Sequence, residues 1–312
     1  MPKINENNIP LQKITANFLT QKKIELYVLR EDLIHPEISG NKWRKLKYNL
    51  QEAKCKGFNQ LLTFGGAYSN HIAATAAAGP DFGFKTIGII RGDEISPLNA
   101  TLQLAQGNGM IFKYISREQY RANNKYETTF IKELEKEYGQ FYLVPEGGSN
   151  TLAVKGCTEI INNIKIDYDV ICCACGTGGT LTGIIASVNN DKRVLGFSAL
   201  KGGSFLEKDI RKLLFDYSVQ YDCNIENMNW ELITDYHLGG FAKIKPELIG
   251  FIREFKENHN VVLDFIYTGK MLFGLYDMIK NSSQFDNKTI IVVHTGGIQG
   301  NKGFEDRLNI AI

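Results

Sequence analysis

The sequence lacks a long apolar run and has almost no net charge. Lysine and arginine number 36 and aspartate and glutamate 34 among the 312 residues, which gives a formal charge of +2. Spanning a bilayer takes about 20 consecutive apolar residues, and no segment approaches that length. So small a charge gives no electrostatic case for nucleic acid or a membrane surface. We therefore expect neither as a partner and look for the site of a small molecule.

We also expect no export signal, because no apolar stretch follows the basic residue in MPKINENNIP. Cysteine is scarce, and three of the six, Cys172, Cys173 and Cys175, crowd one apolar run. An extended strand points Cys172 and Cys173 to opposite faces, and no further CxxC pair occurs to complete a zinc site. We therefore expect reduced, buried thiols, no metal and a cytoplasmic location.

Seven short segments rich in β-branched and aromatic residues alternate with helix-sized stretches. These segments are 60–66, 86–92, 110–115, 141–148, 169–176, 193–200 and 289–297. Continuous apolar strands separated by helices are typical of parallel sheets that helices cover on both faces. The sequence therefore predicts an α/β protein with two lobes, built on open, twisted and mostly parallel sheets.

Three stretches between these strands are candidates for crossover helices. They are the alanine-rich 70–79, the charged 124–138, and 150–164, which starts beside two possible N-caps, Ser149 and Asn150. Residues 215–240 have an irregular pattern and end at a glycine pair, so we expect a loop near a site there.

The first candidate site follows the apolar strand at 169–176 and opens a helix. Glycine lets backbone N–H groups close on an anion, threonine adds hydroxyl donors, and the helix N-terminus contributes its dipole. The residues of this phosphate cradle are Gly176, Thr177, Gly178, Gly179 and Thr180. Leu181 stands where a dinucleotide fingerprint needs its last glycine, which opposes a NAD-dependent dehydrogenase. A tight strand-to-helix turn without a ligand is the alternative.

The second candidate places lysines at the start of a helix, where a cation opposes the helix dipole. If the anion is the phosphate of pyridoxal phosphate, Lys42 can attach the cofactor through its amine. Lys45, one turn on, can reach the phosphate. The alternative is a basic, solvated helix face.

Two further turns carry hydroxyl, amide and imidazole groups at strand ends. In one, Ser69, Asn70 and His71 open the alanine-rich helix, where N-capping and packing are the simpler roles. In the other, Thr295 follows the last strand and is our candidate for the neutral partner of the cofactor's pyridine nitrogen.

The motifs GNKWRKLKY, GGAYSNH, PEGGSN, GTGGT, YTGK and HTGG occur in this order from about Leu26 to Gly297. In this they resemble the 1-aminocyclopropane-1-carboxylate deaminase and D-cysteine desulfhydrase family, within the tryptophan-synthase-β-like, fold type II pyridoxal-phosphate enzymes. The resemblance implies a large domain made of 1–45 and 150–312, a small inserted domain at 46–149, the cofactor in the cleft, and a homodimer.

The resemblance also implies roles for single residues. Lys42 would carry the cofactor, and Asn70 would hydrogen-bond its phenolic oxygen. The phosphate would be held by Lys45 and the cradle of Gly176 to Thr180. Ser69 would meet the substrate carboxylate or take part in proton transfer, and Tyr267 would be an active-site tyrosine, with His71 and Thr268 beside the substrate.

Two positions bear on the substrate, a small amino acid. The family's deaminases have a glutamate after the tyrosine and a leucine in the HxGG turn, whereas this chain has Thr268 and Thr295. These hydroxyls favour a β-eliminating lyase that converts D-cysteine to pyruvate, ammonia and hydrogen sulfide. Deamination of 1-aminocyclopropane-1-carboxylate to 2-oxobutyrate is the alternative, and a non-catalytic protein that binds the cofactor is a distant one. Phe241 and Tyr68 depart from the family pattern, which has a tyrosine and often a glutamine.

Overall fold

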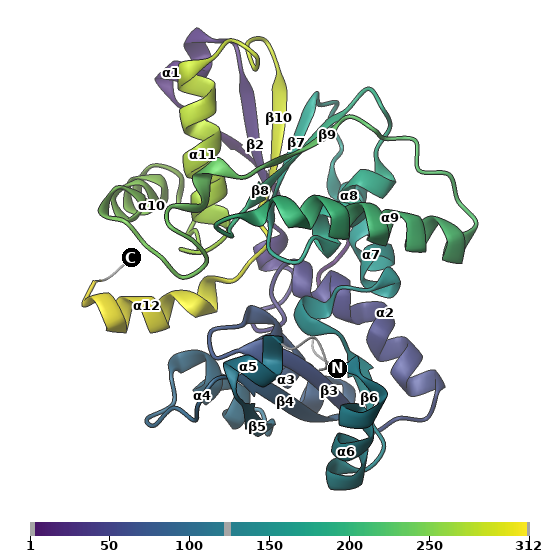
Figure 1. Cartoon of the computed structure of the whole chain (residues 1–312). Helices are drawn as coiled ribbons and strands as arrows, with labels where there is room; N and C mark the ends of the chain where they lie inside the picture. The colour runs from purple at the N-terminus through teal and green to yellow at the C-terminus, as the bar shows by residue number, and fades with distance from the viewer. Residues whose placement is uncertain (1–3, 122–125, 311–312) are drawn as a thin grey trace.

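The computed structural model describes residues 4–121 and 126–310, and its chain forms two sheets (Figure 1). The larger has six strands in the order β1-β2-β10-β7-β8-β9, all parallel except the pair β1 and β2. The strands are β1 (Leu11–Ile14), β2 (Glu25–Leu29), β7 (Val170–Cys175), β8 (Arg193–Ser198), β9 (Trp230–Ile233) and β10 (Thr289–Val293). The last strand in sequence therefore lies in the interior of this sheet.

The smaller sheet has four parallel strands in the order β5-β4-β3-β6. They are β3 (Gln60–Gly66), β4 (Lys85–Arg91), β5 (Ile111–Ile115) and β6 (Tyr142–Val144). All four come from one continuous stretch of sequence. The two sheets confirm the predicted fold class.

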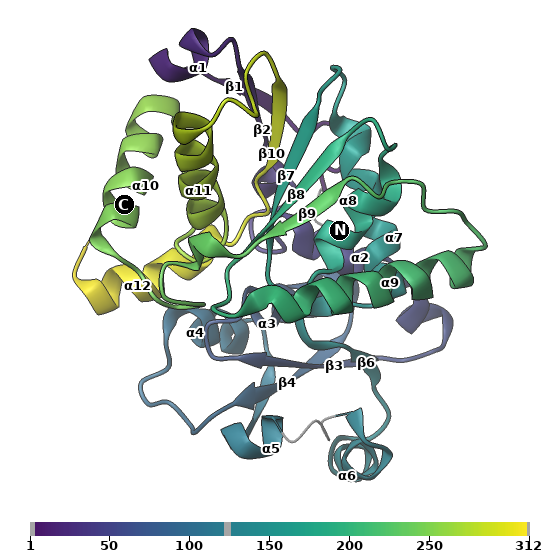
Figure 2. The same cartoon turned by 45° about the horizontal axis from the view of Figure 1, so that its top comes forward.

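Helices cover both faces of the larger sheet (Figure 2). Strand alternation divides its side chains between two cores. Ile171 and Cys173 join a core with α2 (Asn41–Cys55), α7 (Thr151–Thr158) and α8 (Gly179–Ser187), whereas Val170 and Cys172 join a core with α10 (Pro246–His259) and α11 (Thr268–Asn281). Both cores are rich in buried Leu, Ile and Val, each of which contributes about 1.5–3 kcal/mol when fully buried. As predicted, Cys172 and Cys173 point to opposite faces.

The small sheet is covered in the same way. Phe64 and Ile89 face a core with α5 and α6, and Ile90 faces a core with α3 and α4. Within the described ranges, no helix is both long and apolar enough to cross a membrane. The helices are α1 (Asn17–Gln21), α2 (Asn41–Cys55), α3 (Asn70–Phe82), α4 (Ala100–Gly107), α5 (Arg117–Arg121), α6 (Thr128–Tyr138), α7 (Thr151–Thr158), α8 (Gly179–Ser187), α9 (Leu206–Tyr221), α10 (Pro246–His259), α11 (Thr268–Asn281) and α12 (Asn301–Leu308).

Some predicted bounds were wrong. The strand expected at 141–148 ends at Val144, because the glycines that follow form a 3-10 turn with positive φ at Gly147. The helix expected at 150–164 ends at Thr158 and continues as a 3-10 helix. The one expected at 124–138 begins at Thr128, and 124 and 125 lie outside the described residues.

The expectation of a loop at 215–240 was also wrong in part. Helix α9 continues to Tyr221, and β9 occupies Trp230–Ile233. The helix escaped notice because Phe215 and Val219 are exposed on it, which blurs its amphipathic pattern. Residues 234–240 do lead to the pocket described next.

Candidate active site

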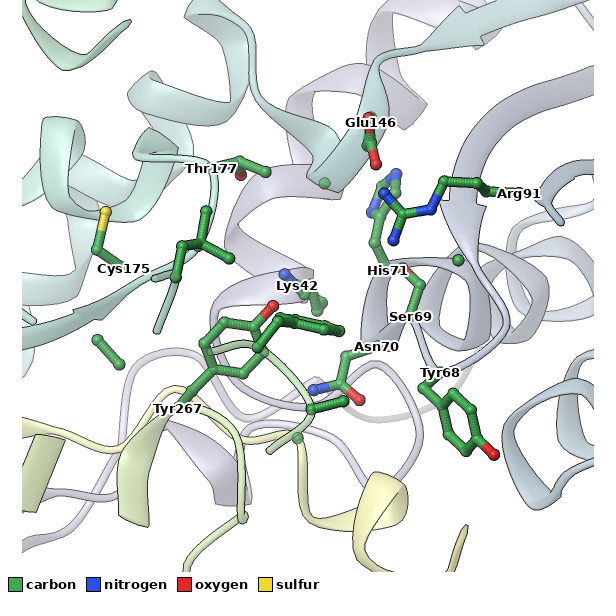
Figure 3. A pocket seen from close by; sticks show the side chains of 18 of the residues that line it. Lys42, Tyr68, Ser69, Asn70, His71, Arg91, Glu146, Cys175, Thr177 and Tyr267 are labelled. Carbon is green, nitrogen blue, oxygen red and sulfur yellow. The ribbon is translucent and has the colours of Figure 1, made fainter. Parts of the chain in front are cut away.

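A cavity of about 910 Å³ lies where the carboxyl ends of strands from both sheets converge. It is bordered by the turns after β3, β4, β6, β7 and β10 and by the first residues of α2. This is the usual place for a ligand in open α/β sheets. Figure 3 shows side chains from both sheets pointing into it.

The start of α2 is fixed by close contact with the turn after β10. Gly40 has a φ of 61°, and a Cβ there would lie 2.0 Å from the Thr295 carbonyl oxygen, so only glycine fits. The Asn41 N–H donates to that same oxygen (3.3 Å). This contact places the next residue, Lys42, inside the pocket.

Lys42 has an amine with no hydrogen bond or ion pair to any residue in 4–121 or 126–310. Burial, aided by the positive charge of Lys45, lowers the pKa of this amine from 10.5 to about 7. Much of it is therefore unprotonated near neutral pH, as a nucleophile or a general base must be.

Lys45 lies one turn further along α2 and is fully hydrogen-bonded. Its Nζ donates to the Gly147 carbonyl oxygen (3.0 Å), Ser149 Oγ (3.1 Å) and Thr177 Oγ1 (3.3 Å). The Ser149 and Thr177 hydroxyls are also bonded to each other at 2.6 Å. A cation and two hydroxyls thus meet beside the turn after β7.

That turn is the predicted phosphate cradle. Gly178 precedes α8 with a φ of 81°, and a Cβ on Gly179 would lie 3.2 Å from Lys45 Nζ. The first N–H groups of a helix have no acceptor within it, which leaves donors at this end of α8. Asn41 Nδ2 donates to Thr180 Oγ1 (2.6 Å), so α8 and α2 are tied together.

The turn after β3 brings Ser69 and Asn70 to the opposite side of the pocket (Figure 3). Ser69 Oγ caps α3 by accepting from the Ile72 N–H (3.4 Å), so the capping role holds, and the residue also lines the pocket. Asn70 Oδ1 accepts from Gln299 Nε2 (3.3 Å), and a Cβ on Gly297 would lie 2.5 Å from Asn70 Nδ2. The turn after β10 thereby fixes the Asn70 amide.

His71 borders the pocket and packs in the small lobe. Its Nε2 is 2.8 Å from Thr63 Oγ1, which donates its proton to the Val144 carbonyl oxygen (2.9 Å). His71 Nε2 is therefore the donor of the pair. Burial lowers the pKa of His71 well below its usual value, so the ring is neutral. A contact between His71 and substrate stays a prediction.

Tyr267 lies at the start of α11 against the cradle. A Cβ on Gly176 would be 2.9 Å from the Tyr267 ring, and Phe241 packs edge-on against that ring at 5.9 Å between centroids. Burial raises the pKa of the Tyr267 phenol far above its ordinary value, so the hydroxyl keeps its proton. In Figure 3 this hydroxyl and the Lys42 amine point into the same part of the pocket.

Thr268 was expected beside the substrate, but the structure places it elsewhere. It is fully buried, is not part of the pocket lining, and donates from Oγ1 to Asp264 Oδ1 (2.7 Å). The same carboxylate accepts the N–H groups of Ile266, Tyr267 and Thr268 at 2.7–2.9 Å. Thr268 therefore helps to cap the start of α11 and does not meet the substrate. The physical reason is that its hydroxyl, four residues after Asp264, donates to the same carboxylate that accepts the first N–H groups of the helix.

Thr295 does line the pocket, 7 % exposed, and its hydroxyl makes no hydrogen bond to the described residues. Tyr68, the other departure from the family pattern, lines the pocket mouth and packs on Phe304 of α12 at 5.6 Å.

Two pocket residues, Arg91 and Glu146, and one residue that contacts the pocket residues Lys45 and Thr177, Ser149, were not recognised from the sequence as site residues. Ser149 was considered only as a cap, although the cap of α7 is Asn150, which accepts from Ala153. Arg91 ends β4, and its guanidinium lies 5.3 Å from the centre of the Tyr120 ring. Glu146 follows β6, and both charged side chains face the pocket in Figure 3. Arg91 is an isolated charge at a strand end and gave no signal in the sequence, whereas Glu146 lies in the PEGGSN motif, to which no role was assigned.

The cysteines are free thiols, and four of them, Cys157, Cys172, Cys173 and Cys175, are buried. Burial raises the pKa of the Cys175 thiol, which borders the pocket, to about 12. Among residues 4–121 and 126–310, no three His, Cys, Asp or Glu side chains gather as metal ligands do.

The donors in the pocket fit pyridoxal phosphate. Lys45, Thr177 and the start of α8 offer a cation, a hydroxyl and N–H groups to a phosphate. Gly179 leaves room there that a Cβ would fill. Lys42 offers an unpaired amine of lowered pKa for attachment to an aldehyde.

Comparison with known proteins agrees with this arrangement. Residues 4–296 match the family described as pyridoxal-phosphate dependent enzyme. A protein of Pyrococcus horikoshii named putative 1-aminocyclopropane-1-carboxylate deaminase is 30% identical over 96% of this chain and 92% of its own length. A mitochondrial protein of Arabidopsis thaliana, named bifunctional D-cysteine desulfhydrase/1-aminocyclopropane-1-carboxylate deaminase, is 32% identical over 88% of this chain and 73% of its own.

A solved structure titled as an ACC deaminase homologue superposes with a TM-score of 0.87 at 28% identity, covering 99% of this chain and 96% of the other. The family match extends over nearly the whole length, and the pocket holds the matching donors. The chain therefore belongs to the pyridoxal-phosphate-dependent enzymes, with pyridoxal phosphate as its cofactor.

Proposed function

We propose that this enzyme removes the β-thiol of D-cysteine and, with one water, forms pyruvate, ammonia and hydrogen sulfide. The observation that carries the proposal is the Lys42 amine, which lies unpaired in the pocket with a pKa of about 7. Such an amine can take the α-proton from an amino acid, the step that starts β-elimination.

Each end of the cofactor has a proposed partner. Lys45, Thr177 and the cradle from Gly176 to Thr180 hold the phosphate. Lys42 carries the cofactor, Asn70 donates to its phenolic oxygen, and Thr295 faces its pyridine nitrogen. These assignments rest on the pocket contacts given above and on the family's motifs.

When bound, pyridoxal phosphate supplies an electron sink that acidifies the α-hydrogen of an amino acid. Ser69 and the N-terminus of α3 bind the substrate carboxylate. Lys42 Nζ, freed when the substrate amine takes its place on the cofactor, would take the α-proton. The C–S bond would then break, and the sulfur would leave with the electron pair. The Tyr267 hydroxyl, which stays protonated and lines the pocket, would give that sulfur a proton. Water then releases ammonia from the remaining three-carbon unit to give pyruvate.

Deamination of 1-aminocyclopropane-1-carboxylate is the second candidate, and one structural observation favours it. Thr268, one of two residues that argued against it, does not reach the pocket. Its substrate has no α-hydrogen, so a nucleophile must open the ring, and the neutral Thr295 hydroxyl and protonated Tyr267 phenol offer none as strong as a carboxylate or thiolate.

The deciding experiment is a product assay on the purified enzyme with saturating cofactor. D-cysteine, L-cysteine and 1-aminocyclopropane-1-carboxylate are supplied separately, and pyruvate, 2-oxobutyrate and sulfide are measured. Pyruvate and sulfide from D-cysteine support the proposal, whereas 2-oxobutyrate in preference to pyruvate supports the deaminase. A protein that binds the cofactor and turns over neither substrate would be the non-catalytic alternative.

We also propose that 1–45 and 150–312 form one domain and 46–149 the other. The separate six-stranded and four-stranded sheets support this division, and α2 (Asn41–Cys55) runs across the boundary at residue 45. A homodimer and a cytoplasmic location complete the proposal, the latter supported by the free thiols. Sedimentation and fractionation of cells test these two points.

A further inference from the structure

Lys270 is a buried cation that the proposed chemistry does not use. It is 2% exposed and projects from the first turn of α11. Its Nζ donates to two backbone carbonyl oxygens, those of His237 (2.9 Å) and Gly240 (2.7 Å). No carboxylate forms an ion pair with it among the described residues, because both oxygens of nearby Asp264 are taken up by the cap of α11.

Burial of this ammonium is costly, and it lowers the pKa of Lys270 from 10.5 to about 8. An apolar side chain of similar length would fill the same space without that cost. The charge therefore has a use that packing alone does not explain.

The two carbonyls belong to a tight turn that ends in the glycine pair. Gly239 and Gly240 have φ angles of 97° and 118°, which turn the backbone so that both oxygens face the same point. Each carbonyl also accepts a backbone N–H, from Gly240 and Lys243 respectively. The ammonium is thus an additional donor that joins the turn to α11, as a bound cation would.

The segment before this turn is attached to the same helix. The Tyr236 hydroxyl donates to Asp277 Oδ2 (2.7 Å), and a Cβ on Gly274 would lie 2.5 Å from the Tyr236 ring. Asp277 is exposed, so the Lys270 contacts are the buried part of this attachment.

The segment after the turn forms a wall of the pocket. Phe241 and Ala242 line the cavity, and the Phe241 ring packs edge-on against Tyr267. Tyr267 directly precedes α11, and Lys270 lies one turn inside it. Lys270 therefore fixes the distance between Tyr267, at the start of its own helix, and the facing ring of Phe241, which follows the turn.

We propose that Lys270 is a positioning residue, a built-in cation that holds residues 237–242 in place and so limits the size of the β-substituent that the pocket accepts. The ammonium occupies a site that two converging carbonyls would offer to any small monovalent cation. The part of this inference that concerns substrate rests on the proposed function, whereas the part that concerns the turn does not.

The first test measures amide hydrogen exchange in a peptide that covers 234–245, using the whole, cofactor-loaded protein. Lys270→Met keeps the volume and removes the donor, and we expect exchange at least about 10-fold faster, which corresponds to losing about 1.4 kcal/mol of local stability. Lys280→Met, on the exposed face of the same helix, is the control and should leave exchange unchanged. Unchanged exchange in Lys270→Met would overturn the proposal.

Lys270→Ala tests the cation site itself. The space it leaves, with two carbonyl oxygens at its end, should take ammonium, so ammonium chloride should restore slow exchange while tetramethylammonium chloride at equal ionic strength should not. Equal recovery with both salts would show an ionic-strength effect and count against a cation site. If Lys270→Ala does not fold, the exchange of Lys270→Met decides alone.

The substrate test compares D-cysteine with the bulkier S-methyl-D-cysteine. In Lys270→Met, kcat/KM for the bulkier substrate should rise relative to D-cysteine by roughly 10-fold, mainly through KM, since one methylene-sized change in a pocket alters discrimination by about 10-fold or more. Phe241→Ala should change the ratio in the same direction, and the double variant should add little more. If the two substitutions change this ratio additively, Lys270 and Phe241 do not act through the same wall of the pocket. If the wild-type enzyme is inactive on both substrates, the proposed function is refuted. The exchange experiment would still test whether Lys270 holds the turn.

Discussion

Lys42 and Lys45 lie one turn apart on α2 and have opposite surroundings. Both are desolvated, and burial lowers the pKa of each amine. Lys45 is held by three acceptors within 3.3 Å, whereas Lys42 has none among the described residues. Helix α2 thus carries Lys45, which is fixed for electrostatic binding, and Lys42, which is free to react. The difference arises because the turns after β6 and β7 supply acceptors to Lys45.

The contrast should appear most strongly when each amine is removed. Lys42→Ala should lower kcat/KM by about 10³-fold, because the attachment point and the base are lost together. The absorption band of lysine-attached cofactor should also disappear. Lys54→Ala, exposed near the other end of α2, serves as control; retention of the band in Lys42→Ala would refute the attachment.

Both lysines depend on how α2 begins, and two glycines test this. Gly40→Ala should lower the free energy of unfolding by roughly 3–5 kcal/mol, through backbone strain and a clash with the Thr295 carbonyl. Gly57→Ala, past the other end of α2, also has positive φ but meets nothing within 4 Å, so about 1–2 kcal/mol is expected. Denaturant unfolding measures both, and equal losses would show that the clash is relieved.

Lys45→Met should weaken cofactor binding rather than chemistry. A hydrogen bond from a charged donor is worth about 1.5–3 kcal/mol, so the Kd for pyridoxal phosphate should rise roughly 10- to 100-fold. At saturating cofactor, activity should return to within a few-fold of wild type. A large loss of kcat that excess cofactor does not restore would mean that the two lysines share the reaction.

The last effect is small per pH unit and concerns the charge of Lys42. The pKa of Lys42 falls from 10.5 in the unfolded chain to about 7, so between these values the unfolded state binds more protons. Stability of the cofactor-free protein should therefore rise from pH 7 toward 10.5, with this lysine contributing a slope of at most about 1.4 kcal/mol per pH unit. Lys42→Met should remove that contribution. An identical slope in both proteins would place the Lys42 pKa near its ordinary value.

The sequence allowed prediction of the residues proposed to hold the cofactor better than those near the substrate. Gly176 to Thr180, Asn70 and Lys42 stand at strand ends or a helix start, where glycine and hydroxyl patterns have a physical reason. Ser149 was missed because a residue that caps a helix and one that faces a ligand have the same chemistry. Its contact with Thr177, 28 residues away, depends on the fold.

Thr268 shows the opposite error. Its place beside Tyr267 suggested a pocket residue, but the carboxylate of Asp264, four residues earlier, takes its hydroxyl. The spacing was present in the sequence, though nothing there ranks a helix cap above a ligand contact. Lys270 was likewise visible only as part of a motif, since its partners are backbone carbonyls about 30 residues away.

The interior position of β10 has a consequence for how the chain folds. The small sheet is complete once residue 144 has been made, and its contacts can form early. In the large sheet, β2 and β7 are joined only through β10, which is made long after either of them. Long-range strand pairing of this kind is slow. The growing chain must therefore keep two unpaired strand edges from aggregating until Thr289–Val293 has emerged, and the turn bearing Thr295 arrives with the strand that closes the sheet.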